Sequence, residues 1–522
     1  MKKLIYTSLI AVLCWSWTSL EAQVRYEDEI FANVQVTENV IYGNNISVLP
    51  PAGPLDLLMD VYQPQGDTAS KRPVVAIATT GNFLPAIVNG GPYGSLKDSA
   101  IVEMCTRFAK RGFVAISFFY RKGWDPLNPI QEIQTATLLQ AAYKGIIDAR
   151  TLARFLRKSV AENNNPYGID PGKMVIGGTG TGGYVSLGTA YLSEFEEVKL
   201  PKFTDFMTGQ PYVDTTVHGN ILGTNTTMQN LPNHLGYASD YHMAFNLGGA
   251  LGDSSWIDAG EIPSVNFHVP TDPNAPYDIG IVIVPTTGST VIDEAAGSFA
   301  VARINNRFGN NDVFKTANLS DPFTQAANTT NNGFEGLFPF ERPFTMGDYN
   351  CAPGVTPATF PRDEEGNPWD WWNEAWFIGA FDAFNMGTPF SGAHANCRQL
   401  AVHPMMSPAM GRTYIDSVMG YLVPRINVAL NLTTTSIENQ LDEGSVSIFP
   451  NPMTDQLNIR LETADNFLQA VEIYNTTGQL VKSVSTGRTG SVVLDREGLT
   501  SGLYLLRVVS DQGSLSQRVL LK

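Results

Sequence analysis

The stretch Met174–Gly188, MVIGGTGTGGYVSLG, restricts the possible folds of this chain more than any other segment. A short apolar run leads directly into a glycine-rich turn, and small and apolar residues follow it. This pattern predicts a buried strand, a tight turn and a helix, which is the repeating unit of a parallel α/β sheet. The glycines also fit G-x-G-x-x-G through Gly178, Gly180 and Gly183, a pattern that can bind a dinucleotide when it opens such a helix.

The same alternation of strands and helices runs through the chain up to residue 432. Strands are predicted over 55–64, 72–81, 113–121, 173–178, 242–251, 262–272 and 311–319, and helices over 98–112, 137–162 and 407–430. Alternation of this kind predicts an α/β fold with a mostly parallel sheet covered by helices on both faces. In a dinucleotide fold the glycine motif sits in the first strand–helix turn. Here at least two such units precede Gly178, so no nicotinamide or other cofactor is expected.

The amino terminus predicts export. Residues 1–22 begin with two lysines, continue as a short apolar run and end at Ala22, as in a secretory signal peptide. The run is shorter than the roughly 20 residues of a membrane-spanning helix, and no later segment reaches that length. Cys14 raises a lipoprotein alternative, but the large Leu13 before it argues against that reading. The net charge of −16 argues against nucleic-acid binding, because phosphate recognition needs a basic surface.

Three cysteines remain after the signal peptide. In an oxidising compartment one disulfide is expected, and Cys351–Cys397 is the favoured pair. Cys105 lies in a segment of helical spacing and is expected in the core. No metal-ligand spacing such as H-E-x-x-H or paired C-x-x-C occurs, so no metal site is predicted.

Composition changes near residue 431, and we expect a linker over 433–444 and a separate domain over 445–522. That domain reads as six or seven short strands separated by turns, which predicts a small β-sandwich. It closely resembles the type A C-terminal sorting domain of the type IX secretion system. The matching residues are Phe449-Pro450-Asn451-Pro452, Ile473-Tyr474, Gly478, Leu499, Ser501-Gly502-Leu503-Tyr504 and Val519-Leu520-Leu521-Lys522. The resemblance implies export across the outer membrane, with the type IX secretion machinery as partner of residues 445–522.

Residues 23–432 resemble a second known family. From Leu55 to about Asp272 the chain resembles secreted esterases of the α/β-hydrolase superfamily. The order of the matching segments carries this resemblance: 55–64, 74–83, 112–124, 144–178 and 262–277. It implies that Met174–Gly188 is the nucleophile elbow G-x-S-x-G, with Gly180 where the serine should be.

The resemblance also places the other catalytic groups. Thr80 and Gly81 stand in the oxyanion turn, where the family has a histidine–glycine run. Asp272 ends an apolar strand at the position of the triad acid, although an aspartate capping a turn before proline explains it equally well. Glycine cannot form an acyl intermediate, so Gly180 places activity in most doubt.

No other residue is an obvious replacement. Thr179 and Thr181 flank the elbow, and Ser186 falls nearly two turns along the helix, so none is expected to point into the cleft. Thr181 stands where the backbone N–H after the nucleophile would serve as an oxyanion donor. His394 and His403 both lie between the acid and the last helix, and we favour His394 as the base, real or vestigial. A hydrogen-bonded loop histidine is its default interpretation, and His268 is expected to be structural.

Two regions, about 200–241 and 318–393, are expected to be cap insertions over the cleft. The second contains four tryptophans, among them Trp371 and Trp372. They could form a stacking platform for a ligand, although tryptophans at helical spacing more often form the core of a cap.

The sequence therefore predicts an exported protein, secreted or at the cell surface, with an α/β-hydrolase-like domain and no serine nucleophile. The favoured hypothesis is a pseudo-hydrolase that keeps a cleft for an ester-, glycan- or lipid-like ligand. One alternative is an active ester hydrolase with a non-standard nucleophile such as Thr181. The other is a structural protein of the surface or matrix.

Overall fold

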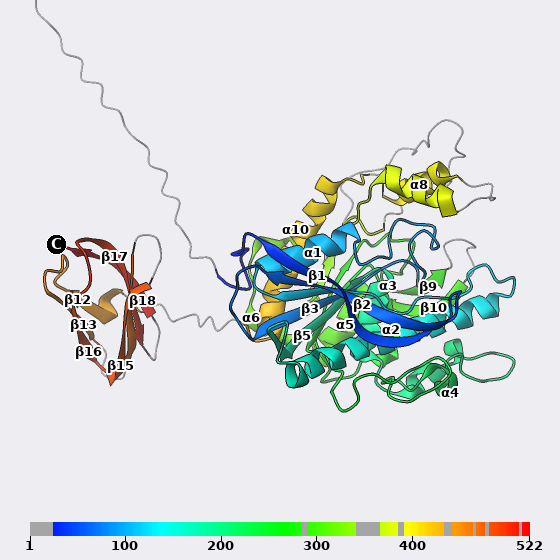
Figure 1. Cartoon of the computed structure of the whole chain (residues 1–522), viewed down its shortest axis with the longest axis horizontal. Helices are drawn as coiled ribbons and strands as arrows, with labels where there is room; N and C mark the ends of the chain where they lie inside the picture. Colours follow the sequence, from blue (N-terminus) through cyan, green and yellow to red (C-terminus); the bar gives the residue numbers. More distant parts are fainter. Residues whose placement is uncertain are drawn as a thin grey trace, which may run out of the picture. The chain divides into compact units, whose positions relative to one another are not determined.

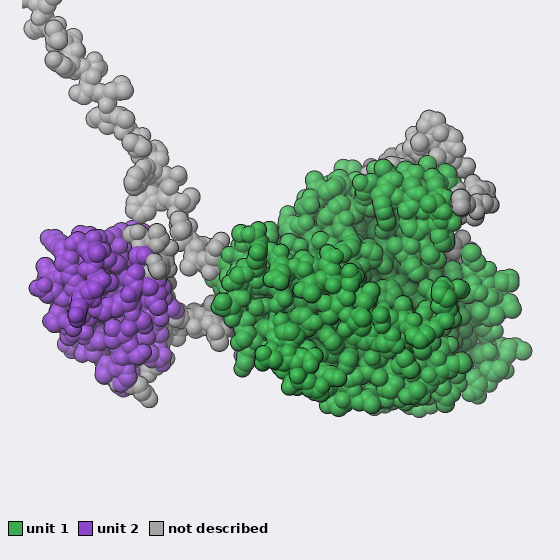
Figure 2. Space-filling model, viewed as in Figure 1, with its two compact units in different colours: residues 1–430 green, residues 431–522 purple. Residues whose placement is uncertain are grey.

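The computed structural model describes residues 24–283, 290–340, 366–384, 391–403, 405–432, 441, 443–462, 466–475, 480–510 and 514–522. The chain forms two compact units, residues 1–430 and 431–522 (Figure 2). The expected signal peptide and Cys351 lie outside the described residues, as does most of the expected linker. Within the described ranges, no helix is both long and apolar enough to cross a membrane.

An eight-stranded sheet forms the centre of the first unit (Figure 1). Its strands are β1 (Val34–Ser47), β2 (Gly53–Pro64), β3 (Arg72–Ala78), β4 (Val114–Phe118), β5 (Ile169–Thr179), β6 (Met243–Leu247), β8 (Ser264–His268) and β11 (Leu337–Pro339). They lie in the order β1-β2-β4-β3-β5-β6-β8-β11; β2 is antiparallel to β1 and β4, and the other neighbours are parallel. This order, with its one antiparallel strand near the edge, is that of the α/β-hydrolase fold. The predicted fold class is confirmed.

Helices cover the two faces of this sheet, which explains why β3 and β4 are buried at every position. The main ones are α1 (Ser99–Lys110), α2 (Gln131–Glu162), α3 (Thr181–Tyr191), α5 (Ser298–Phe308) and α10 (Pro408–Ala429). Helices α1 and α10 pack together on one face, and α2 packs with α3 on the other (Figure 1). The periodicity of α1 shows the cause, because Ile101, Met104, Cys105 and Phe108 form its buried side.

The prediction for the last strand was wrong. Residues 311–319 contain helix α6 (Asp312–Ala317), and the last strand of the sheet is β11. Phe314 of α6 is buried, and Val313 and Ala317 fall one helical turn apart beside it. The true strand has three residues, too few to show a periodicity. Because β11 pairs with β8, residues 337–339 belong to the sheet and not to the insertion expected over 318–393.

Shorter elements complete the first unit. Strands β7 (Ala250–Leu251), β10 (Thr290–Gly297) and β9 (Ile279–Ile283) form a small antiparallel sheet. The remaining helices are η1 (Phe195–Lys199), η2 (Pro201–Phe203), α4 (Thr215–His218), η3 (Ser254–Trp256), α7 (Pro322–Asn328), α8 (Glu374–Phe384) and α9 (Gly392–Val402).

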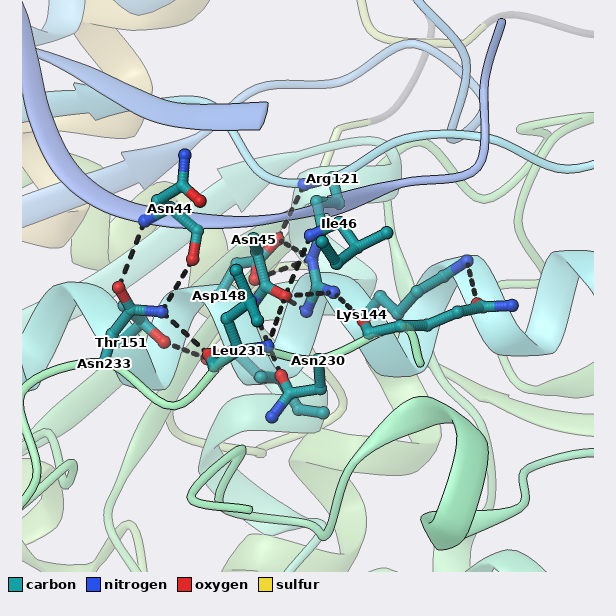
Figure 3. Close-up of polar contacts among 12 residues, drawn as sticks. Asn44, Asn45, Ile46, Arg121, Lys144, Asp148, Thr151, Asn230, Leu231 and Asn233 are labelled. Atoms are coloured by element: carbon teal, nitrogen blue, oxygen red, sulfur yellow. Dashed lines mark hydrogen bonds and ion pairs between the residues drawn. The ribbon is translucent and has the colours of Figure 1, made fainter. Parts of the chain in front are cut away.

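A buried ion pair anchors the insertion expected over 200–241 (Figure 3). The guanidinium of Arg121 lies 2.9 Å from the carboxylate of Asp148 in α2, and both side chains are almost fully buried. Arg121 also donates to the carbonyl of Gln229 at 2.6 Å and to the amide oxygen of Asn45 in β1 at 2.9 Å. The insertion is therefore held against α2 and β1 by polar contacts, which is how a loop-rich segment satisfies its buried backbone groups.

The second unit is a two-sheet β-structure with its own apolar core. One sheet holds β12 (Val446–Phe449), β13 (Gln456–Leu461) and β16 (Ser491–Asp495), and the other holds β15 (Leu480–Thr489), β14 (Leu468–Tyr474), β17 (Gly502–Ser510) and β18 (Ser514–Leu521). The alternation of buried and exposed residues in β17 matches this packing. The small β-sandwich predicted for the tail is confirmed.

Candidate active site

A single residue makes the turn between β5 and α3. Strand β5 ends at Thr179 and α3 begins at Thr181, so Gly180 alone lies between them. Its φ of +52° and ψ of −118° are sparsely populated and would cost a residue with a side chain roughly 1–3 kcal/mol. A nucleophile elbow holds its central residue in such a strained strand-to-helix turn. The turn therefore has the backbone geometry that a nucleophile elbow requires, with glycine at its centre.

The other glycines of this stretch are required by close packing of the chain on itself. A Cβ added to Gly178 would lie 2.2 Å from the backbone of Gly182, and one added to Gly182 would lie 2.3 Å from the carbonyl oxygen of Ala78. A Cβ on Gly183 would lie 2.0 Å from the side-chain oxygen of Asn246. The protein itself fills the space in front of these glycines. The pattern G-x-G-x-x-G thus serves the packing of strand on helix and leaves no room there for a phosphate.

Thr80 fills the space where a side chain at position 180 would begin. It follows β3 at the carboxyl edge of the sheet, and a Cβ on Gly180 would lie 2.3 Å from its Oγ1 and 3.4 Å from its Cβ. The buried ammonium of Lys122 fixes this turn by donating to the carbonyls of Thr80 and Gly94, each at 2.7 Å. Burial lowers the pKa of Lys122 to about 8. The threonine hydroxyl is thus held where a serine side chain would begin.

Asp272 follows β8 at the same edge of the sheet. Its Oδ1 accepts a hydrogen bond from the backbone N–H of Asn274 at 2.7 Å, as in the turn-capping interpretation. Its Oδ2 points toward Gly248, the residue after β6, and would lie 3.3 Å from a Cβ there. The carboxylate therefore caps a turn and also faces the region of the elbow.

Asn367 lies between Asp272 and Gly180. Its Nδ2 would be 3.7 Å from a Cβ on Gly180. Its Oδ1 would be 2.6 Å from a Cβ on Gly248, and Asp272 Oδ2 would be 3.3 Å from that same Cβ. In a Ser-His-Asp triad the base occupies this intermediate place. An amide cannot take up a proton as imidazole does, so Asn367 cannot act as a general base. No pattern in the sequence marks Asn367, since an isolated asparagine carries no catalytic signature.

The structure places the two candidate histidines in and directly after helix α9. His394 is in the first turn of α9, where its backbone N–H donates to Ser391 Oγ at 3.2 Å. His403 is buried at the end of α9 against the rings of Tyr93 and Trp372, and burial lowers its pKa to about 3. Neither supplies one of the three atoms nearest to a Cβ on Gly180.

His268 has partners for both ring nitrogens. Its Nδ1 lies 2.8 Å from Ser298 Oγ, and its Nε2 lies 3.2 Å from the carbonyl oxygen of Ala275. These contacts match the structural role expected for it.

The hydroxyl residues near the elbow have other contacts or surroundings. Thr181 Oγ1 lies 3.1 Å from the hydroxyl of Tyr120. Ser186 is buried and donates to the carbonyl of Phe245 at 2.6 Å, on the sheet side of α3. Thr179 is fully buried at the end of β5. Among these three, Thr181 alone is partly exposed.

The tryptophans divide between the site and the packing around it. Trp369 is fully buried, and its ring would lie 3.3 Å from a Cβ on Gly248, so it forms a wall of the site. Trp372 is buried and donates to Asn396 Oδ1 at 2.9 Å, while the guanidinium of Arg412 lies over the ring of Trp371. The two tryptophans proposed as binding residues, Trp371 and Trp372, therefore contact protein. No pattern in the sequence distinguishes Trp369 from them.

Cys397 is disulfide-bonded, and Cys105 is a buried free thiol. Among the residues that the structure describes, no group of three or more His, Cys, Asp or Glu side chains could hold a metal ion.

A comparison with protein families identifies the second unit. Residues 447–522 match the family described as the secretion system C-terminal sorting domain. The tail is thus a type IX sorting domain, which indicates export and a secreted or cell-surface location. A search of curated proteins found no relative of the chain.

The first unit is similar to solved esterase structures. Esterase 2 of Thermogutta terrifontis, phosphorylated by paraoxon, is 21% identical over 49% of this chain and 77% of its own, with a TM-score of 0.28. The propionate-bound form of the esterase from this Planctomycetes species is 18% identical over 63% and 90%, with a TM-score of 0.31. The native form is 18% identical over 64% and 89%, with a TM-score of 0.32. At such scores the fold follows from the strand order described above and not from these similarities.

Proposed function

We propose that the first unit is a pseudo-hydrolase: an exported α/β-hydrolase-like domain that binds a ligand at the cell surface or outside the cell without forming an acyl intermediate. One observation carries this proposal. The elbow backbone persists at Gly180, while Thr80 Oγ1 lies 2.3 Å from the point where a nucleophile's Cβ would stand. The nucleophile is absent, and a neighbouring side chain has taken its space.

The surroundings of the elbow support the same conclusion. The position between Asp272 and Gly180 holds Asn367, which cannot accept the proton of a nucleophile. Thr80 itself has a hydroxyl at the right place, but a threonine hydroxyl needs an adjacent base to become a nucleophile. These residues together favour binding over hydrolysis.

An active hydrolase with Thr181 as nucleophile is the main alternative. It would need His394 or another base to reach Thr181, whose hydroxyl contacts Tyr120 instead. A structural role in a surface matrix is the second alternative. It predicts a folded domain that binds no small ligand.

The decisive experiment rebuilds the triad in the full chain. Wild type is incubated with p-nitrophenyl butyrate and with a fluorophosphonate probe, beside Gly180→Ser, Thr80→Ala/Gly180→Ser and Thr80→Ala/Gly180→Ser/Asn367→His. We expect neither labelling nor hydrolysis in wild type, and labelling of residue 180 in the triple variant. Adding Asp272→Asn to the triple variant should reduce its labelling rate, because the rebuilt imidazole loses its orienting carboxylate.

The active-hydrolase alternative predicts a different pattern. Wild type would hydrolyse the ester at enzyme-like rates, the probe would modify Thr181, and Thr181→Val would abolish both signals. Hydrolysis by wild type that Asp272→Ala leaves unchanged would contradict both the proposed function and the triad assignment.

A further inference from the structure

One of the two sheets in the second unit has an apolar outer face. In the sheet β15-β14-β17-β18 (Figure 1), side chains alternate between the core and the outer surface. Leu503 of β17 points outward and is exposed by 45%, and Leu505 of β17 and Leu520 of β18 are exposed by 42% each. None of the three belongs to the apolar core of the sandwich. The packing of the sandwich therefore gives no reason for leucine at these positions.

The strand register gathers apolar residues on this face. Leu503 is paired with Leu520. Leu505 is paired with Tyr474 of β14, and Tyr474 is paired with Leu480 of β15. Side chains of directly paired residues lie on the same face of a sheet, about 5 Å apart. These residues therefore form one continuous surface, which we call the leucine face: Tyr474, Leu480, Leu503, Leu505 and Leu520.

Charged residues border the leucine face. The carboxylate of Glu472 accepts hydrogen bonds from the Tyr474 hydroxyl at 2.7 Å and from the Arg507 guanidinium at 3.2 Å. Arg518 is paired with Leu505, is exposed, and makes no ion pair with the residues that the structure describes. The leucine face thus combines an apolar surface with a positive charge at its border.

The outer face of the other sheet is more polar. Gln456 of β13 donates to Asp495 Oδ1 of β16 at 2.8 Å, and both side chains are exposed. The apolar residues exposed on this face include Phe449 and Val493, and Asn458 separates them because it is paired with both. Since contiguous apolar patches mark interaction sites, the leucine face is the better candidate for binding a partner.

Part of the edge of the same sheet is already occupied. The backbone N–H of Met453 donates to the carbonyl of Leu520 at 2.8 Å. The side chain of Asn451 accepts from the N–H of Leu520 at 3.0 Å and donates to the carbonyl of Arg518 at 2.9 Å. The chain itself therefore pairs with the end of β18, so a partner cannot add a strand there. Recognition at this end of the sheet has to use its face.

The family of the second unit indicates what covers the leucine face. Residues 447–522 match the secretion system C-terminal sorting domain, and a sorting domain is recognised by export machinery. A folded tail offers that machinery its outward side chains. Leu503 and Leu520 are among the residues through which the tail resembles sorting domains, although the core does not use them. Residues that a sorting signal needs but its core does not are suited to recognition.

We infer that the leucine face is the surface through which the secretion machinery recognises this tail. The partner surface that fits it is apolar and carries a carboxylate near Arg518. The inference concerns the second unit and does not depend on the function proposed for the first.

Export of the full chain by a bacterium with a type IX secretion system tests this inference. In Leu503→Gln/Leu505→Gln, two outward leucines of β17 become polar at similar size. Ser491→Gln/Val493→Gln is the matched control, because it changes two exposed residues at the same spacing in β16. An antibody against the first unit compares the protein in the medium and on the cell surface with the protein in the periplasm. Removal of the tail after export therefore does not affect the result.

The leucine variant should accumulate in the periplasm, and the control should be exported like wild type. Each leucine is a little under half exposed, so the loss of both apolar contacts predicts about ten- to fiftyfold weaker recognition. Arg518→Glu should also reduce export, whereas Arg518→Lys should retain it. Unchanged export of Leu503→Gln/Leu505→Gln, or an equal loss in the control, would overturn the inference.

Two measurements on the purified full chain separate recognition from folding. Amide hydrogen exchange of β14 and β17, followed by mass spectrometry, should match wild type in both variants, because the core side chains are unchanged. If exchange rises in the leucine variant, the single change Leu520→Gln on β18 takes its place in the export assay. A lower urea midpoint of the first unit in the leucine variant would show that the leucine face packs on the first unit, and this would overturn the inference.

Discussion

Restoring a side chain at position 180 should destabilise the first unit, and the cost should depend on Thr80. In Gly180→Ala the new Cβ lies 2.3 Å from Thr80 Oγ1, far inside contact distance, and Lys122 holds the Thr80 backbone in place. Overpacking of this kind costs about 1–3 kcal/mol. The backbone strain of a non-glycine residue at φ +52° adds about 1–3 kcal/mol. We expect a total loss of about 2–6 kcal/mol.

Removing the hydroxyl should relieve one of these contributions. In a Thr80→Ala background only the Cβ of residue 80 remains, at 3.4 Å, which is an ordinary contact. The cost of Gly180→Ala should then fall to about 1–3 kcal/mol, the strain alone. The double-mutant cycle should therefore show a coupling of about 1–3 kcal/mol between the two positions.

Urea unfolding followed by tryptophan fluorescence measures this cycle in the full chain. Every tryptophan precedes residue 431, so the signal reports the first unit and not the sorting domain. A coupling below about 0.5 kcal/mol, the usual error of additivity for independent sites, would refute the claim that Thr80 fills the nucleophile's place.

Three further predictions concern the rest of the first unit. Arg121→Met should cost about 3–5 kcal/mol in urea unfolding, because it leaves the Asp148 carboxylate buried without its counter-ion; an effect below 1 kcal/mol would contradict the anchoring role. His403 has a pKa of about 3 in the folded protein and about 6.5 in the unfolded chain, so the unfolded chain takes up the proton at the higher pH. As pH falls below 6.5, His403 therefore lowers the free energy of unfolding by up to about 1.4 kcal/mol per pH unit. His403→Phe should reduce that slope in unfolding curves at pH 7, 6 and 5, and an unchanged slope would show that the ring is not buried as a neutral group. Burial raises the pKa of the Cys105 thiol, so iodoacetamide should alkylate it only after unfolding, and rapid labelling of the native protein would argue against a core position.

Long periodic segments made the fold predictable. The apolar spacing of α1, the buried run of β5 and the glycine turn after it are enough to identify the central α/β layers. The three-residue strand β11 was missed because its position is set by its pairing with β8. The local sequence of so short a strand does not encode that pairing. The helix at 312–317 was mistaken for a strand because so short a segment shows little periodicity.

The site could be predicted only where it lies on a regular element. Gly180 and Asp272 follow strands whose patterns are readable, and their places were inferred from those strands. Asn367 and Trp369 reach the elbow from a segment that follows β11 by more than 25 residues, so no spacing rule connects them to it. The role of Thr80 depends on an interatomic distance across two loops, which requires the folded chain.

The proximity of Thr80 to Gly180 also constrains the order in which the two positions can change. A serine introduced alone at position 180 would clash with the Thr80 hydroxyl and destabilise the first unit. Removal of that hydroxyl first would open the path. The order of substitution therefore matters: a side chain at position 180 is tolerated only after position 80 has lost its hydroxyl.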